Sequence, residues 1–206
     1  MESDMYFSIN SQNPQMRLIK KAAEVLRDGG VIIYPTDTVY GLGCDLFNKK
    51  GIERIYDIKR RNKKQPFSFV CADLKDISRY ARVSDYAYKT MKRLLPGPYT
   101  FILEASRLVP KIILPKRQTT GIRVPDNRIC LALVRELGQP IISTSVKTDN
   151  GDILSDPYEI REKLGHRVDL VIDGGILVPE QSSVVNLVDD MIEVIRVGKG
   201  DVSTLI

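Results

Sequence analysis

Residues 34–45 read YPTDTVYGLGCD and follow directly on an apolar run, Val31-Ile32-Ile33. A short apolar run of this kind is typical of a buried strand. The twelve residues include two threonines, two aspartates, two tyrosines and two glycines. A polar segment at the end of a strand forms either a plain turn or a ligand-binding loop. The elements on both sides of it help to decide between the two.

Helical and strand patterns alternate around this stretch. Before it, Asn13-Pro14 is a typical helix start, with asparagine as the N-cap and proline at the first helical position. An apolar stripe at helical spacing follows and ends at Gly29-Gly30. Further helices are expected around 52–56, at 84–95, at 129–137 and from Asp156 onward. Strands are predicted at 31–34, 67–71, 99–103, 121–124, 141–142, 168–172, 184–188 and 192–197.

The order of these elements indicates an α/β fold. Several predicted strands follow each other through short connections, which an all-parallel βαβ sheet does not allow. We therefore expect a twisted mixed sheet that is flanked by helices. A chain of 206 residues without repeats or a Pro/Gly/Ser-rich linker fits a single domain over residues 1–206.

Composition narrows the class of protein. The formal net charge is +5 and the isoelectric point about 9.0, which fits an anionic partner or simply a mildly basic soluble protein. No apolar stretch approaches the roughly 20 residues that a membrane helix needs. The acidic start Met1-Glu2-Ser3-Asp4 lacks the apolar core of a secretory signal. We therefore expect a cytoplasmic protein with no membrane partner.

Cysteine and histidine contents argue against disulfides and metal sites. The three cysteines are odd in number and widely spaced, so we expect reduced thiols. The single histidine, His166, excludes a multi-histidine metal site. No residue of this chain is therefore predicted to ligate a metal.

The densest charge cluster is at residues 59–64, Lys-Arg-Arg-Asn-Lys-Lys, where five of six residues are basic. The usual interpretation of such a run is a solvated face. Its place in a loop between a short helix and a strand also fits an anion site. A bound anion would relieve the repulsion among these like charges.

Hydroxyl and cationic side chains recur at the predicted strand ends. Arg123 stands between apolar neighbours on a strand, where a carboxylate or a phosphate would satisfy it. Ser143-Thr144-Ser145 follows the strand at 141–142 and either caps a turn or contacts a ligand. Ser182-Ser183 and Arg196 repeat the pattern. Strand ends are the usual location of ligand sites on α/β sheets.

Taken in order, these motifs resemble the YrdC/YciO family, whose best-known members are threonylcarbamoyl-AMP synthases. The resemblance runs from about residue 15 to the C-terminus, and it implies a twisted α/β sheet around a large, basic, concave cavity. The motifs that carry it are residues 34–43, Lys59-x-Arg61 with Pro66, Pro96-Gly97-Pro98-x-Thr100, Arg123-Val124-Pro125, Ser143-x-Ser145, Ser183-x-Val185 and Arg196-x-Gly198.

The resemblance also implies a reaction. L-threonine, bicarbonate and ATP give threonylcarbamoyl-AMP and pyrophosphate, for the threonylcarbamoyladenosine modification of tRNA. By the same resemblance, Lys59 and Arg61 are the catalytic residues that meet the ATP phosphates, and Mg²⁺ is the expected cofactor. Threonine is expected to bind at Thr36, Tyr40 and Arg123. The nucleotide is expected to bind at Lys59, Arg61, Ser143, Ser145, Ser183 and Arg196.

One motif departs from the synthase pattern. Synthases typically carry Ser-x-Asn after the late strand, whereas this chain has Ser145-Val146-Lys147. The segment Ser143-Thr144-Ser145-Val146 is similar to the YciO-like branch of the family.

Three hypotheses therefore stay open. The first is an ATP-dependent L-threonylcarbamoyladenylate synthase of low activity. The second is a double-stranded RNA- or nucleotide-binding protein without synthase activity. The third is a nucleotide-dependent enzyme that uses another amino acid or carbonyl donor. The retained Thr36 and Lys59-x-Arg61 favour the first, since RNA binding alone does not need them.

Overall fold

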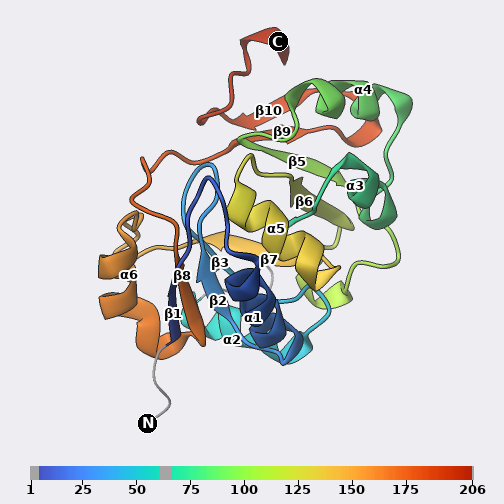
Figure 1. Ribbon diagram of the computed structural model, residues 1–206. Coiled ribbons are helices and arrows are strands. Elements are labelled where there is room, and N and C mark those ends of the chain that lie inside the picture. Colours follow the sequence, from blue (N-terminus) through green and yellow to red (C-terminus); the bar gives the residue numbers. More distant parts are fainter. Residues whose placement is uncertain (1–4, 61–65, 206) are drawn as a thin grey trace.

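A sheet of ten strands forms the frame of the computed structural model, which describes residues 5–60 and 66–205 (Figure 1). The strand order is β1-β8-β2-β3-β7-β4-β6-β5-β9-β10. The strands are β1 (Met5–Ser8), β2 (Ile32–Tyr34), β3 (Gly41–Gly43), β4 (Ser68–Val70), β5 (Tyr99–Glu104), β6 (Thr119–Arg123), β7 (Ile141–Ser145), β8 (Leu170–Asp173), β9 (Ser183–Asn186) and β10 (Glu193–Arg196). The helices are α1 (Met16–Arg27), α2 (Lys49–Ile58), α3 (Leu74–Tyr80), α4 (Asp85–Leu94), α5 (Arg128–Leu137) and α6 (Pro157–Leu164), with short 3-10 helices at Lys111–Ile113, Gly165–Arg167, Val188–Asp190 and Ser203–Leu205.

Parallel and antiparallel pairs are mixed in this sheet. The pairs β1–β8, β2–β8, β4–β6 and β5–β9 are parallel. The pairs β2–β3, β3–β7, β4–β7, β5–β6 and β9–β10 are antiparallel. The predicted mixed sheet flanked by helices is therefore confirmed.

Helices cover both faces of the sheet. Helices α1 and α5 lie together across one face (Figure 1), where Leu26 and Leu133 share a buried cluster with Tyr34 of β2. On the other face, Ile55 of α2 belongs to a second buried cluster with Phe69 of β4. Each helix repeats its apolar residues every three to four positions, so one stripe faces the sheet. None of the helices within the described residues is long and apolar enough to cross a membrane.

The opening stretch of the sequence folds back on β2 as the short strand β3. Gly43 pairs with Ile32 and Gly41 pairs with Tyr34. The backbones approach closely here, because a Cβ added to Gly43 would lie 2.1 Å from the carbonyl oxygen of Ile142 in β7. Glycine is therefore required at residue 43 for β3 to lie between its two neighbours.

Three elements, β1, β3 and α3, are absent from the sequence-based predictions. Two of the three residues of β3 are glycines, and glycine is depleted in strands, so local propensity does not indicate this strand. Pairing on both sides, with β2 and with β7, stabilises it instead. The strand predicted at 141–142 also continues to Ser145 through this pairing.

The predicted helix start at Asn13-Pro14 is wrong. Helix α1 begins at Met16, and its N-cap residue makes no side-chain hydrogen bond. The side chain of Asn10 accepts hydrogen bonds from the backbone N–H groups of Gln12 and Asn13. Residues 10–13 thus form a side-chain-stabilised turn that delays the start of the helix.

We predict that Gly43→Ala destabilises the protein by about 2–3 kcal/mol, because the new methyl group would overlap the carbonyl oxygen of Ile142 in β7. The matched control is Gly41→Ala on the same strand, where the added Cβ would lie no closer than 3.0 Å to the Tyr34 ring. The Gly41→Ala control is expected to lower the free energy of unfolding by about 1 kcal/mol or less. Urea unfolding of both variants measures the difference, and an equal loss would contradict the role given to Gly43.

Candidate ligand-binding cavity

A cavity of about 250 Å³ is lined by residues of β3, β4, β5, β6, β7, β9 and β10 and of the loop after β2. Nine of its lining residues carry hydroxyl groups, and two arginines are its charged residues, whereas no carboxylate side chain lines it among the described residues. The hydroxyl-bearing residues are Thr36, Ser68, Thr100, Thr119, Thr120, Ser143, Thr144, Ser145 and Ser182. A hydroxyl-rich surface with two cations suits a polar, anionic ligand.

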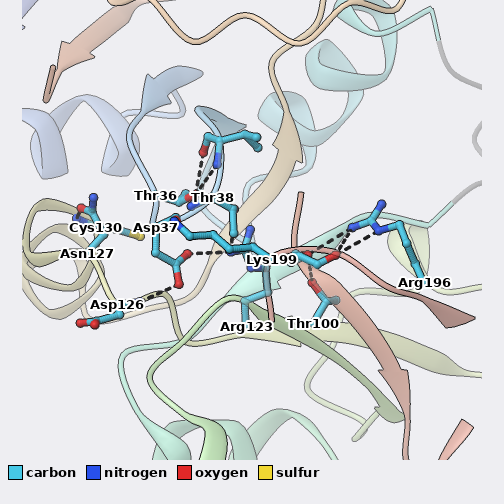
Figure 2. A network of polar contacts seen from close by, with 12 residues as sticks. Thr36, Asp37, Thr38, Thr100, Arg123, Asp126, Asn127, Cys130, Arg196 and Lys199 are labelled. Atoms are coloured by element: carbon cyan, nitrogen blue, oxygen red, sulfur yellow. Dashed lines mark hydrogen bonds and ion pairs between the residues drawn. The ribbon is translucent and has the colours of Figure 1, made fainter. Parts of the chain in front are cut away.

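Arg123, at the end of β6, is one of the two arginines. Its Nη2 donates to Oδ1 of Asp37 at 2.8 Å and to the Thr38 hydroxyl at 2.9 Å (Figure 2). Both side chains of the Arg123–Asp37 ion pair are only 8% exposed. The other carboxylate oxygen of Asp37 accepts the backbone N–H of Asp126 at 3.1 Å. The ion pair therefore fixes the loop after β2 against β6.

Two buried polar atoms at the cavity lack a hydrogen-bond partner within the described chain. These atoms are Nε of Arg123 and the hydroxyl oxygen of Thr120. Both residues line the cavity. An unsatisfied buried donor costs free energy, so a ligand that accepts these hydrogen bonds would recover it.

Thr36 lines the cavity, and its hydroxyl also organises its own loop. The hydroxyl donates to the carbonyl of Val39 at 2.6 Å and accepts from the backbone N–H groups of Thr38 and Val39. The side chain is buried. This part of the opening stretch is thus a side-chain-stabilised turn whose face borders the cavity. The contact of Thr36 with threonine stays a prediction.

Arg196 of β10 provides the second cation. Its guanidinium donates to the backbone carbonyl of Ser182 at 3.0 and 2.7 Å (Figure 2). The Ser182 hydroxyl lies 2.8 Å from that of Thr100. Partial burial, and next the positive charge of Arg123, lower the pKa of Arg196. The positive charge of Arg123 thus acts on Arg196, and no carboxylate side chain of the described residues lines the cavity, so a bound anion would relieve this repulsion.

Tyr40 and Ser183 are not among the residues that line the cavity. The Tyr40 hydroxyl donates to the carbonyl of Gly175 at 2.7 Å and accepts from the N–H of Gly174. Burial raises its pKa. The Ser183 hydroxyl is buried between the carbonyl of Gly200 and the N–H of Gly198. Both side chains hold loops next to the cavity, and their ligand contacts stay predictions.

Lys59 lies at a second, smaller hollow rather than in the cavity. Its Nζ donates to the backbone carbonyl of Ser145 at 2.9 Å. Ser145 itself lines the cavity, so this hydrogen bond connects the hollow with the cavity. Lys147 also lines the hollow. Arg61 lies outside the described residues.

The structure thus brings Thr36, Arg123, Ser143, Ser145 and Arg196 together around one cavity. Sequence reasoning missed Thr120 and the ion-pair role of Asp37, and it selected Ser183 where Ser182 lines the cavity. The alternation of side chains along β6 could have indicated Thr119, Gly121 and Arg123 as one face. The register that decides which face borders a cavity is a property of the folded sheet.

Comparisons with known proteins agree with this architecture. Residues 24–198 match the Sua5_yciO_yrdC family model, described as "Telomere recombination". The chain is 44% identical to the Escherichia coli protein YciO, described as uncharacterized, over 96% of this chain and 97% of that one. It is 32% identical to the threonylcarbamoyl-AMP synthase of Coxiella burnetii, over 76% of this chain and 84% of that one.

Two solved structures share the fold. The crystal structure of E. coli YciO matches with a TM-score of 0.93 and 43% identity, over 98% of this chain and 99% of that one. The crystal structure of P. abyssi Sua5 complexed with L-threonine matches with a TM-score of 0.83 and 26% identity, over 89% of this chain and 54% of that one. The family match spans most of the chain, and the chain belongs to the Sua5/YciO/YrdC family.

Proposed function

We propose that this protein is an ATP-dependent L-threonylcarbamoyladenylate synthase of low activity. The observation that carries the proposal is the cavity, where the described residues provide nine hydroxyl-bearing side chains, two arginines and two buried polar atoms without a partner among them. A nucleotide and an amino acid both present the anionic and hydrogen-bonding groups that such a lining suits. A 32% identical relative is a threonylcarbamoyl-AMP synthase, and L-threonine is present in the similar Sua5 structure.

The proposed reaction has two steps. The amine of L-threonine combines with bicarbonate to give a carbamate and water. A carbamate oxygen then attacks the α-phosphorus of ATP, a new P–O bond forms, and the bond to the β-phosphate breaks. Pyrophosphate leaves with the electron pair of that bond. A sheltered cavity protects the carbamate from water, so the protein would act by positioning the reactants and excluding solvent.

The lining residues divide between the two substrates in this proposal. Thr36 and Arg123 would face threonine, since Arg123 retains an unpartnered Nε for a carboxylate. Ser143, Ser145 and Arg196 would face the nucleotide. Tyr40 would help hold the threonine loop and Ser183 the nucleotide loop. Lys59, and Arg61 beyond the described residues, would meet the phosphates.

The protein side chains at the cavity and at the smaller hollow beside Lys59 are poorly suited to bind Mg²⁺. Mg²⁺ is usually bound through one or two carboxylates together with substrate phosphates. Within the described residues, no group of three His, Cys, Asp or Glu side chains could hold a metal ion. The one carboxylate that the described chain places at the hollow is that of Asp149, and it pairs with two arginines. Any magnesium would therefore come with the phosphates of ATP rather than reside in the protein.

A connection to tRNA is part of the proposal, since threonylcarbamoyl-AMP supplies the group for the threonylcarbamoyladenosine modification.

The second candidate is a nucleotide- or double-stranded RNA-binding protein without synthase activity. Lys147, at the position of the synthase asparagine, is the observation that favours this alternative. It adds a positive charge and cannot accept a hydrogen bond.

We predict that ATP is converted to AMP-containing product and pyrophosphate only when L-threonine and bicarbonate are both present. Pyrophosphate release is measured with each substrate omitted in turn. Loss of pyrophosphate release whenever one substrate is left out supports the synthase function. Release that continues without threonine would point to a different acceptor, and binding of ATP without any release would favour the second candidate.

We also predict that Lys147→Asn raises the rate of threonine-dependent pyrophosphate release about tenfold, equivalent to about 1.4 kcal/mol of activation free energy. Asparagine restores a hydrogen-bond acceptor and removes a charge that would retain the departing pyrophosphate. The rate is measured at saturating ATP in wild type and variant. An unchanged rate in a folded variant that still binds ATP would show that Lys147 does not limit turnover.

A further inference from the structure

A second hollow, of about 90 Å³, lies beside the C-terminal end of α2. It is lined by Ile58, Lys59 and Arg60 from that end, by residues 146–149 that follow β7, and by Leu42, Leu164 and Arg167. The hollow is much smaller than the cavity of about 250 Å³, and a phosphate group is small enough for a space of this size.

Among the residues that the structure describes, four cationic side chains and one carboxylate line this hollow. The cations are Lys59, Arg60, Lys147 and Arg167, and the carboxylate is Asp149, which leaves a net charge of +3. Asp149 lies 3.5 Å from Arg60 and 3.8 Å from Arg167. A single carboxylate shared by two arginines cannot balance both of them.

Two backbone carbonyls at or beside the hollow already accept hydrogen bonds. Nη2 of Arg167 donates to the carbonyl of Ile58 at 3.0 Å, and Nζ of Lys59 donates to the carbonyl of Ser145 at 2.9 Å. Lys147 is half-buried. Its ammonium makes no hydrogen bond or ion pair with any other described residue. The hollow thus has a partly desolvated cation without a counter-charge of its own.

We propose that this hollow binds a phosphate group of a small polyphosphate directly, without a divalent cation, and that Lys147 is its principal donor. The net charge of +3 repels a metal ion and attracts an anion. An ammonium group with three N–H donors can contact several phosphate oxygens at once. The inference rests on the proposed function only in taking pyrophosphate, the product of that reaction, as the polyphosphate.

The experiment is a calorimetric titration of the full-length protein with inorganic pyrophosphate in the presence of EDTA. Wild type is expected to bind pyrophosphate under these conditions. Lys147→Gln is expected to weaken binding about tenfold or more, because a charge-assisted hydrogen bond is lost. Lys147→Arg keeps the charge and is expected to bind within about threefold of wild type. Asp149→Asn is expected to tighten binding, since it removes the negative charge of the hollow.

The matched control is Lys89→Gln, which makes the same charge change on the exposed face of α4. It is expected to bind pyrophosphate like wild type. Binding that requires Mg²⁺, or equal affinities for wild type and Lys147→Gln, would overturn the inference. The second result would place pyrophosphate elsewhere, for example in the cavity with Arg123 and Arg196. Circular dichroism of each variant confirms that it is folded.

Titration of the same protein with ATP and Mg²⁺ separates this inference from the proposed function. If pyrophosphate binding fails the test but threonine-dependent turnover is seen, the proposed phosphate site in the hollow is rejected and the proposed synthase function is kept. If pyrophosphate binds through Lys147 but ATP neither binds nor reacts, the hollow stands and the synthase is rejected.

Discussion

The buried ion pair between Asp37 and Arg123 is the contact on which the cavity depends. In the order of strands, β2 and β3 are separated from β6 by β7 and β4. The pair joins the loop between β2 and β3 to the end of β6 across this distance. Removing one member of a buried pair typically costs about 3–5 kcal/mol, since the other charge is left without compensation. The positions of Thr36 and Thr38 therefore follow from this pair as much as from their own turn.

The ion pair also determines which hydrogen-bond donors of Arg123 remain for a ligand. Asp37 and Thr38 occupy its Nη2, whereas its Nε has no partner within the described chain. The carboxylate balances most of the charge of this arginine, so Arg123 would act mainly as an oriented donor. Arg196 is held by neutral acceptors, the backbone of Ser182 and the side chain of Gln181. The uncompensated positive charge at the cavity is therefore concentrated on the β10 side.

Much of the fold could be predicted from the sequence, because apolar periodicity and end signals are local. Ser84 accepts a hydrogen bond from the N–H of Ala87 as the N-cap of α4, and α5 ends at Gly138 in a left-handed conformation. Strand β3 could not be predicted, because partners more than a hundred residues away contribute to its stability. The same limit explains the choice between Ser182 and Ser183. Adjacent residues on a strand point to opposite faces, and only the assembled sheet decides which face borders a cavity.

The end of β7 separates the cavity from the hollow. Ser143 and Ser145 line the cavity, whereas Val146 and Lys147 line the hollow, although Ser145 and Lys147 are only two residues apart. Continuous strand alternation would have placed these two side chains on the same face. The strand ends at Ser145, and Lys147 instead pairs with Ile153 across a turn. A change at residue 147 therefore alters the charge of the hollow while the side chains that line the cavity stay the same. Through this division, a lysine in place of asparagine can change how phosphates are held without changing which nucleoside or amino acid the cavity accepts.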